Sequence, residues 1–163
     1  MNGTLYFSGS GELYKSDGTT NTLIMDINPS GNSNPSNFTY QNGEVFFIAD
    51  DGINGQEIWK TDGTAAGTVM LGQVGVTQNS TPGNGLIYNG FTYFSANDGI
   101  TGHELWRTDG TTNGTTLVKD ILTGIWSSSP IRFTASQGLF YFSAYGNNIG
   151  NELVRSNGTT AVT

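Results

Sequence analysis

One eight-residue stretch occurs four times along this chain, and its spacing constrains the fold more than any other feature. The stretch is 104–111, and its copies occupy 12–19, 57–64 and 152–159. Landmark glycines keep the same period, with intervals of 47 and 48 residues separating Gly43, Gly90 and Gly138, and again separating Gly63, Gly110 and Gly158. A fixed period of this size indicates a repeat protein. The first copy is five residues shorter between Gly3 and Gly18, which predicts the loss of part of a loop and not of a strand.

Each copy consists of short strand-like segments separated by turn residues. The second copy predicts strands at 37–40, 44–49, 57–61 and 68–71, and Asn42-Gly43 between apolar runs is a strong hairpin signal. The third predicts strands at 87–88, 91–96, 104–108 and 116–121, and the fourth opens with a hairpin of 131–135 and 139–144. On this pattern the chain begins at the second strand of a unit and ends, at 160–163, just inside a fourth strand.

The strands after the hairpin turns carry bulky residues at successive positions, as in Val45-Phe46-Phe47-Ile48 and Phe140-Tyr141-Phe142. Successive side chains of a strand point to opposite faces, so both faces of each sheet require covering. Sheets stacked face to face satisfy this requirement, as in a β-propeller. The 24 glycines and the low charged fraction of 12% also favour strands and turns over helices.

We therefore predict an all-β, β-propeller-like fold of about three and a half four-stranded blades of ~47 residues. The single repeat domain, 1–163, divides into repeats at approximately 1–34, 35–83, 84–129 and 130–163. An incomplete set of blades leaves open strand edges. We expect the chain to be part of a longer propeller, or to be a subunit completed by another copy.

Charge and composition exclude several classes of function. The formal net charge is −7 with only six basic residues, which argues against nucleic-acid binding. The absence of cysteine leaves no disulfide framework and no thiolate site. No apolar run approaches the roughly 20 residues of a membrane span, so no membrane insertion is expected. Met1-Asn2-Gly3 opens directly in repeat material and not in a signal peptide, so we expect either that the protein is not secreted or that the sequence is a mature or internal piece of a longer chain.

Two repeated polar columns are candidates for structural roles. A residue that recurs at the same place in every copy usually performs the same structural task in each, whereas catalysis needs one asymmetric constellation. The glutamate column is Glu12, Glu57, Glu104 and Glu152, and a basic residue follows three positions later in each copy. We expect each glutamate to pair with a basic residue or with backbone donors of a neighbouring blade. The second column, Asp17, Asp62, Asp109 and Asn157, precedes Gly and Thr and predicts a turn.

The aromatic residues divide into a repeated column and one outlier. Trp59 and Trp106 share a column with Tyr14 and Val154, and the valine favours packing between blades over sugar stacking. Trp126 lies outside the repeat pattern, in a loop-like segment, and is a candidate contact for a glycan or a protein partner.

The loops 50–57 and 97–104 crowd oxygen donors among glycines, which leaves a calcium site as an alternative to a plain hairpin connection. Its candidate ligands are Asp50, Asp51, Asn97 and Asp98, with Asp51 and Asp98 as the ligand-binding candidates. No other cofactor is predicted. His103 is interpreted as a solvated loop residue, since a single histidine with no thiol makes a poor metal site and nothing beside it suggests a catalytic triad.

The motif order resembles that of a known bacterial repeat family. The residues that carry the resemblance are 93–99, 102–111 and 118–121 of the third copy, and the family is named for its E-L-W-x-x-D-G-T motif. The layout is also similar to that of kelch blades, although the paired kelch glycines are replaced here by Ser-Ala-x-Asp-Gly. The resemblance to the first family implies a large secreted or cell-surface bacterial protein, often with a C-terminal sorting domain that this sequence does not contain. It assigns no activity.

These observations favour a non-enzymatic extracellular or cell-surface module that acts as a scaffold or adhesin. The connections at 28–37, 72–83 and 123–129 differ most between copies and are expected to present the contacts, with a protein or a surface glycan as partner. A lectin-like propeller that binds glycans in clefts between blades is the alternative. A propeller hydrolase or lyase is the weakest of the three hypotheses, because no catalytic constellation is visible.

Overall fold

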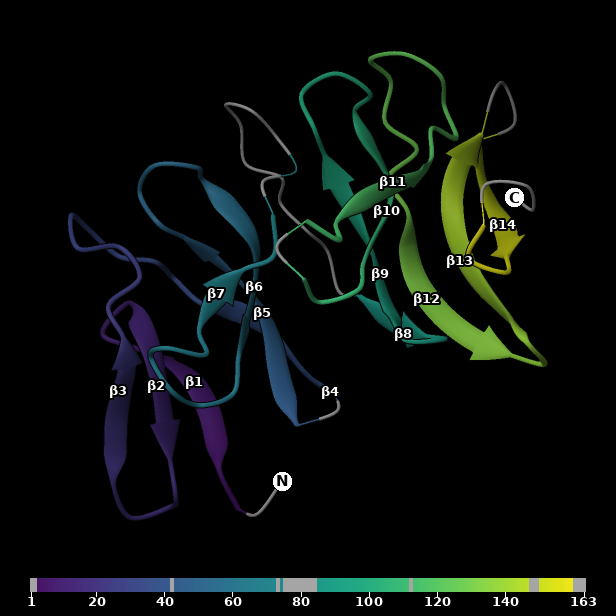
Figure 1. Cartoon of the computed structure of the whole chain (residues 1–163). Helices are drawn as coiled ribbons and strands as arrows, with labels where there is room; N and C mark the ends of the chain where they lie inside the picture. The colour runs from purple at the N-terminus through teal and green to yellow at the C-terminus, as the bar shows by residue number, and fades with distance from the viewer. Residues whose placement is uncertain are drawn as a thin grey trace.

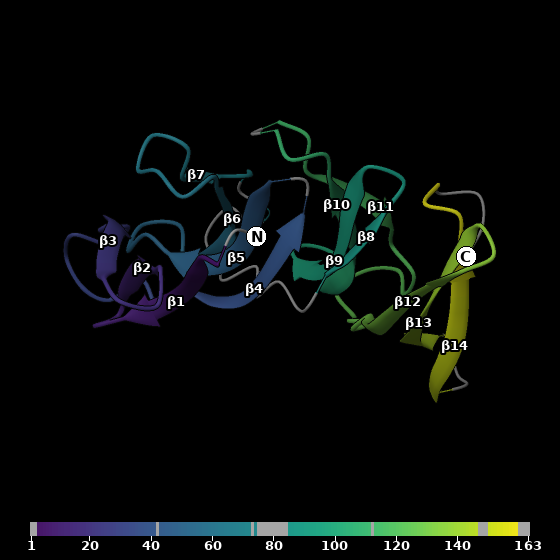
Figure 2. The same ribbon diagram turned by 90° about the horizontal axis from the view of Figure 1, so that it is seen from below.

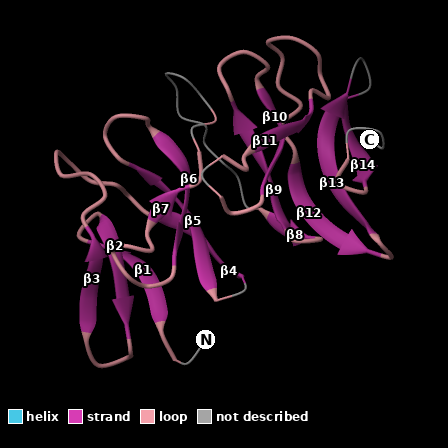
Figure 3. Cartoon of the chain, viewed as in Figure 1, coloured by secondary structure: helices cyan, strands magenta, loops and turns pink. Residues whose placement is uncertain are grey.

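The computed structural model describes residues 3–41, 43–72, 74, 85–111, 113–146 and 150–159, and these residues form four antiparallel β-sheets (Figures 1 and 3). The sheets follow one another in chain order, and each is a simple meander in which neighbouring strands are hydrogen-bonded. Figure 2 shows them from below as a row, with the first sheet at one end and the fourth at the other. No helix occurs among the described residues.

The outer two sheets have three described strands each and the inner two have four. Sheet 1 contains β1 (Leu5–Gly9), β2 (Glu12–Ser16) and β3 (Asn21–Met25). Sheet 2 contains β4 (Ser36–Gln41), β5 (Glu44–Asp50), β6 (Gln56–Thr61) and β7 (Val69–Met70). Sheet 3 contains β8 (Leu86–Tyr88), β9 (Phe91–Asn97), β10 (His103–Thr108) and β11 (Thr116–Lys119). Sheet 4 contains β12 (Ile131–Ser136), β13 (Leu139–Gly146) and β14 (Gly150–Ser156).

The all-β prediction is confirmed, and most expected strands lie within one or two residues of their predicted bounds. The predicted strand at 68–71 is shorter than expected, because only Val69 and Met70 pair with β6. His103 is half-buried at the start of β10, so its interpretation as a solvated loop residue was wrong. The predicted strand at 160–163 and most of the variable connection 72–83 lie outside the described residues.

Two hairpin turns, one between the first and second strands of the third copy and one between the second and third strands of the first copy, place residues in the left-handed region of φ. Asn89 and Gly90 join β8 to β9 with φ values of 49° and 82°. Ser10 and Gly11 make the shorter turn of the first copy, between β1 and β2, with φ values of 50° and 84°. Two-residue turns of this kind match the twist of the strands that they join. The first copy has therefore shortened a loop and kept both strands, as its glycine spacing predicts.

Three apolar clusters lie between the four sheets, one in each gap. Phe46 and Phe47 show how successive residues serve different gaps, since Phe46 packs with sheet 3 and Phe47 packs with sheet 1. The gap between sheets 3 and 4 is the richest in aromatic rings, and the Tyr93 and Phe140 ring centroids are 4.5 Å apart there. Stacking of this kind covers both faces of the two inner sheets, as the strand pattern predicts.

The tryptophan column faces the preceding sheet in each unit. Trp59 packs against sheet 1 and Trp106 against sheet 2, with side chains 7% and 9% exposed. Val154 takes the same position against sheet 3. Tyr14 lies on the corresponding face of sheet 1, where its ring contacts Phe7 at 5.8 Å between centroids. The packing interpretation of this column is confirmed for the three copies that follow another sheet.

We predict that Phe94→Ala lowers the free energy of unfolding by about 3–5 kcal/mol, because the ring is fully buried between sheets 2 and 3 and its removal leaves a cavity. Chemical denaturation monitored by circular dichroism measures the change. Ile100→Ala is the matched control, since its side chain is 66% exposed in a loop and its loss should change stability little. Equal effects of the two substitutions would contradict the burial of Phe94.

Candidate functional site

In three of the four copies, the repeated glutamate is hydrogen-bonded to the connection that leads to the next sheet. The fully buried carboxylate of Glu104 accepts hydrogen bonds from the amides of Ile121 and Ser128 at 2.7 and 2.9 Å. Its third bond comes from the Ser128 hydroxyl at 2.7 Å. Burial nevertheless raises the pKa of Glu104 above its ordinary value, because desolvation outweighs the three donors.

The first copy repeats this arrangement donor for donor. Glu12 accepts from the amides of Ile27 and Ser33 and from the Ser33 hydroxyl, at 3.0, 2.9 and 2.6 Å. Each serine then reaches the next sheet through its carbonyl oxygen, which accepts the Asp50 amide at Ser33 and the Tyr145 amide at Ser128. We call this chain of bonds the Glu–Ser clamp. Its donors are amides and hydroxyls of the glutamate's own repeat, and not the basic residue or backbone donors of a neighbouring blade that the sequence predicts.

The other two glutamates differ in environment. Glu57 is fully buried, and its carboxylate accepts the Val74 amide at 3.3 Å. Glu152, in sheet 4, is exposed. The column is therefore structural in the first three copies and solvent-facing in the fourth.

The serines of the clamp were missed by the sequence reasoning, although the sequence holds a signal for them. Both lie in a Ser-x-Pro segment, 33–35 and 128–130, and a third such segment, 80–82, falls between them at intervals of 47 and 48 residues. The middle residue has a positive φ of 47° at both Asn34 and Ser129. A period search on Ser-x-Pro would have found these positions. The segment 80–82 lies outside the described residues.

The basic column crosses to the following sheet. The Lys15 ammonium donates to the Gly63 carbonyl at 2.8 Å, and the Arg107 guanidinium donates to the Gly158 carbonyl at 3.0 Å. Lys60 differs, because its ammonium pairs with Glu44 of its own sheet at 2.8 Å. Two of the three described gaps are therefore joined by a cation on a glycine carbonyl.

The Asp-Gly-Thr column forms the predicted turn in all four copies. The amide of the threonine donates to the side-chain oxygen of Asp17, Asp62, Asp109 and Asn157 at 2.8 to 3.0 Å. The glycine of each turn has a φ between 85° and 92°. The Thr20 amide and then the Thr19 side chain lower the pKa of Asp17 to about 2. Asn157 makes the same bonds without a charge.

The candidate calcium ligands Asp51 and Asp98 are already engaged by their own loops. The Asp51 carboxylate accepts hydrogen bonds from the amides of Ile53 and Asn54, at 2.9 and 2.7 Å. The Asp98 carboxylate accepts the equivalent bonds from the amides two and three residues after it. Burial acts to raise the pKa of Asp51, but these donors outweigh it and hold the pKa below its ordinary value. Within the described ranges, no group of three or more acidic, histidine or cysteine side chains is placed to hold a metal ion. The carboxylates act as turn caps in this structure.

Trp126 lies in a loop that the clamp holds at its base. Residues 123–129, here named the Trp126 loop, connect sheet 3 to sheet 4, and the Ser127 hydroxyl accepts the His103 amide at 2.9 Å. Ile125 and Trp126 are 79% and 67% exposed. The equivalent positions of the first copy, counted back from the clamp serine, are Ser30 and Gly31, which carry no large apolar side chain. The third copy thus presents two neighbouring apolar side chains from an anchored loop.

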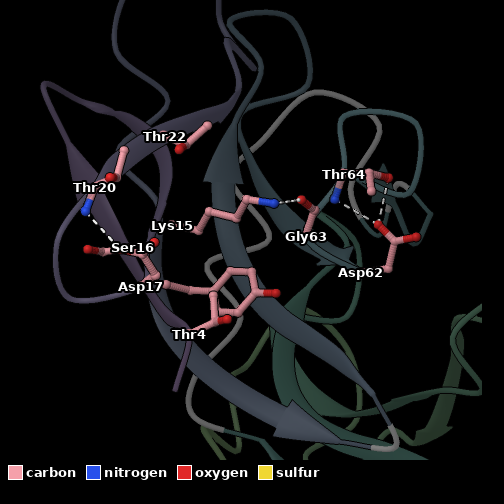
Figure 4. A pocket seen from close by; sticks show the side chains of 10 residues that line it. Thr4, Lys15, Ser16, Asp17, Thr20, Thr22, Asp62, Gly63 and Thr64 are labelled. Atoms are coloured by element: carbon pink, nitrogen blue, oxygen red, sulfur yellow. Dashed lines mark hydrogen bonds between the residues drawn. The ribbon is translucent and has the colours of Figure 1, made fainter. Parts of the chain in front are cut away.

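A polar cleft lies between sheets 1 and 2 (Figure 4), with a volume of about 320 Å³. Hydroxyl groups dominate its lining, which comprises Thr4, Tyr6, Lys15, Ser16, Asp17, Thr20, Thr22, Asp62, Gly63 and Thr64. Lys15 crosses the cleft to the Gly63 carbonyl. Burial, followed by the nearby Asp62 charge, raises the pKa of Tyr6, so its hydroxyl stays protonated. The cleft offers hydroxyl donors and acceptors of the kind that bind sugars.

We predict that Glu104→Gln lowers the free energy of unfolding by about 1–3 kcal/mol, because one amide oxygen cannot satisfy the donors that two carboxylate oxygens satisfy. Thermal or urea unfolding measures the loss. Glu152→Gln is the matched control in the same column and should leave stability unchanged, since that side chain is exposed. An unchanged stability of Glu104→Gln would refute the clamp.

We predict that the Asp-Gly-Thr turns make the fold acid-sensitive. Above the ordinary pKa of 3.8, the hydrogen-bonded Asp17 carboxylate contributes its full stabilisation, and this contribution is lost as the pH falls through about 2. Asp62 and Asp109 act in the same direction, each through the hydroxyl and then the amide of its threonine. Replacing all three aspartates with asparagine, as at position 157, should flatten the fall of urea midpoints between pH 4 and pH 2. Parallel curves for the variant and the parent would contradict the prediction.

Comparisons with known proteins identify a similar fold and no family. No protein-family model matches the chain, and no curated protein matches it. The computationally designed Ika8 protein matches with a TM-score of 0.54 and 15% identity over 99% of this chain, which spans 45% of the length of the designed chain. The designed Ika4 protein matches with a TM-score of 0.52 and 15% identity over 94% of this chain and 85% of its own. An α-L-arabinofuranosidase from Clostridium thermocellum matches at a TM-score of 0.42, 15% identity, and coverages of 99% and 68%.

No helix within the described parts of the chain is long and apolar enough to cross a membrane.

Proposed function

We propose that this chain is a non-enzymatic repeat module of β-propeller type, displayed outside the bacterial cell or on its surface, that contacts a protein partner through the Trp126 loop. The observation that carries the proposal is the contrast between the copies. Glu104, Arg107 and Asp109 of the third copy all form structural hydrogen bonds, whereas Ile125 and Trp126 point to solvent from an anchored loop. Exposed aromatic and apolar side chains held on a rigid base are typical of interaction hot spots.

The propeller arrangement is supported by how the sheets approach one another. Strands of different sheets come closest between β1 and β4 and between β8 and β12, which lie at or near the start of each meander. Sheets that radiate from a common axis approach one another in this way at their inner strands. Apolar clusters fill all three gaps between the described sheets, and the Glu–Ser clamp recurs in the first and third gaps. Secretion and the bacterial source are proposed from the resemblance to the E-L-W-x-x-D-G-T family.

We predict that beads coated with this chain adhere to cells of the bacterium that produces it, and that Trp126→Ser reduces adhesion about tenfold or more, the effect of losing one hot-spot residue. Protease treatment of the cells should remove the adhesion if the partner is a protein. Ile53→Ser is the control, because Ile53 is 88% exposed in another loop and should be neutral. Adhesion that survives Trp126→Ser would refute the assignment of the contact to this loop.

A second candidate function is glycan binding, and the cleft between sheets 1 and 2 favours it. Its volume of about 320 Å³ and its hydroxyl-rich lining suit one or two sugar units. A glycan array probed with the parent chain and with Thr4→Val, which removes one hydroxyl of the lining, distinguishes the two functions. Binding that Thr4→Val weakens and Trp126→Ser leaves intact would assign the activity to the cleft.

A further inference from the structure

Sheet 4 leaves exposed Leu153 and Arg155, which occupy positions that the other sheets use to bind the sheet that follows them. Leu13, Ile58 and Leu105 face the next sheet and are 0%, 5% and 0% exposed. Leu153 takes the same position in β14 and is 77% exposed. A leucine of the repeated packing column therefore faces solvent in the last sheet.

Two earlier sheets, sheets 1 and 3, carry the same kinds of polar residue on this face. Tyr6 pairs across the strands with Lys15, and Tyr93 pairs with Arg107. Both pairs contact a turn glycine of the following sheet, Gly63 or Gly158. The cation donates a hydrogen bond to the carbonyl of that glycine, and the tyrosine ring lies beside it. In sheet 4, Tyr141 pairs with Arg155 in the same register, and Arg155 is exposed.

Sheet 1 exposes the other half of the interface. Leu5 in β1 is 63% exposed, whereas the equivalent positions Val45, Thr92 and Phe140 are 2%, 3% and 0% exposed. Phe7 and Tyr14 lie on the same face of sheet 1 as Leu5, opposite the face that covers sheet 2. This face is the one with which sheets 2, 3 and 4 cover their predecessors.

The glycine turn of sheet 1 has no preceding sheet within the described part of the chain to donate a cation to its carbonyl. A tyrosine hydroxyl faces Gly63 and Gly158, and the Phe46 ring faces Gly110. Among the described residues, nothing lies within 4 Å of the point where a Cβ atom would stand at Gly18, although its φ of 92° and its turn geometry match the others. The carbonyl of this turn is thus presented in the geometry that Lys15 and Arg107 bind elsewhere.

We propose that a second copy of this chain docks head to tail, with its sheet 1 stacked on sheet 4 of the first copy. The contact repeats the interface between sheets 3 and 4: Arg155 donates to the Gly18 carbonyl of the second copy, and Leu153 is covered by Leu5 and Phe7 of the second copy. The occupant is a second copy because the two exposed faces are the two halves of an interface already present three times within the chain. The contact does not involve the Trp126 loop, so it is independent of the partner proposed above.

Head-to-tail contacts join unlike faces, so they close into a ring or extend into a filament. Light scattering coupled to size-exclusion chromatography distinguishes these from a monomer. We expect a mass of at least twice 17.3 kDa for the parent chain. We expect Leu153→Glu and Leu5→Glu each to shift the mass to that of a monomer without loss of folding, because both side chains are exposed within one chain.

Mixing the two variants tests the direction of docking. Leu153→Glu keeps an intact sheet 1 face and Leu5→Glu keeps an intact sheet 4 face, so an equimolar mixture should form a one-to-one dimer. Ile53→Glu is the control, since it adds the same charge at an isoleucine that is 88% exposed and lies away from both faces. A monomeric parent chain, an oligomer that survives Leu153→Glu, or a mixture that stays monomeric would each overturn the proposal.

Discussion

The Glu–Ser clamp is the interaction on which the order of the sheets depends. A row of meander sheets has no hydrogen bonds between the faces that it stacks, so apolar packing alone leaves the angle and register between sheets loosely fixed. The clamp supplies directional hydrogen bonds. Glu104 accepts them from amides at both ends of the connection, and the Ser128 carbonyl accepts one from an amide of the next sheet. A buried carboxylate is costly unless its lone pairs are satisfied, and the amide and hydroxyl donors supply that satisfaction. The same arrangement at Glu12 shows that it belongs to the repeat and not to one site.

The first and third gaps between sheets share the clamp, and the three gaps differ in their other polar contacts. The first and third gaps join a tyrosine and a cation to a glycine turn, whereas the second gap replaces the tyrosine with Phe46 and turns Lys60 back onto Glu44. The substitution of phenylalanine for tyrosine removes a hydroxyl from that gap, and the lysine finds its partner within its own sheet. Tyr6 and Lys15 line the polar cleft of the first gap.

Sequence reasoning reached the strands and turns because their signals are local. The positive φ of Gly63 and the bond from Thr64 to Asp62 follow from adjacent residues, and so does the alternation that sends Phe46 and Phe47 to different gaps. The sequence predicted the role of the glutamates only in part. A strand pattern indicates the face of the sheet on which a charged side chain lies, but not the groups that it contacts there. Ser33 and Ser128 are separated from their glutamates by 21 and 24 residues, and the burial of His103 depends on a neighbouring loop. These positions required the three-dimensional arrangement.

The repeat also explains where binding can evolve in such a chain. A column such as Asp17 or Glu104 is committed in each copy to a bond that holds the turn or the connection, so its chemistry is not available to a ligand. Change is tolerated where the backbone is already fixed by neighbours, because a new side chain there costs no structure. The Trp126 loop meets this condition, since Ser127 and Ser128 anchor its end while Ile125 and Trp126 face outward. The outer faces of sheets 1 and 4 differ from this loop because they keep the packing residues of the repeat. The partner that suits them is therefore another sheet of the same kind.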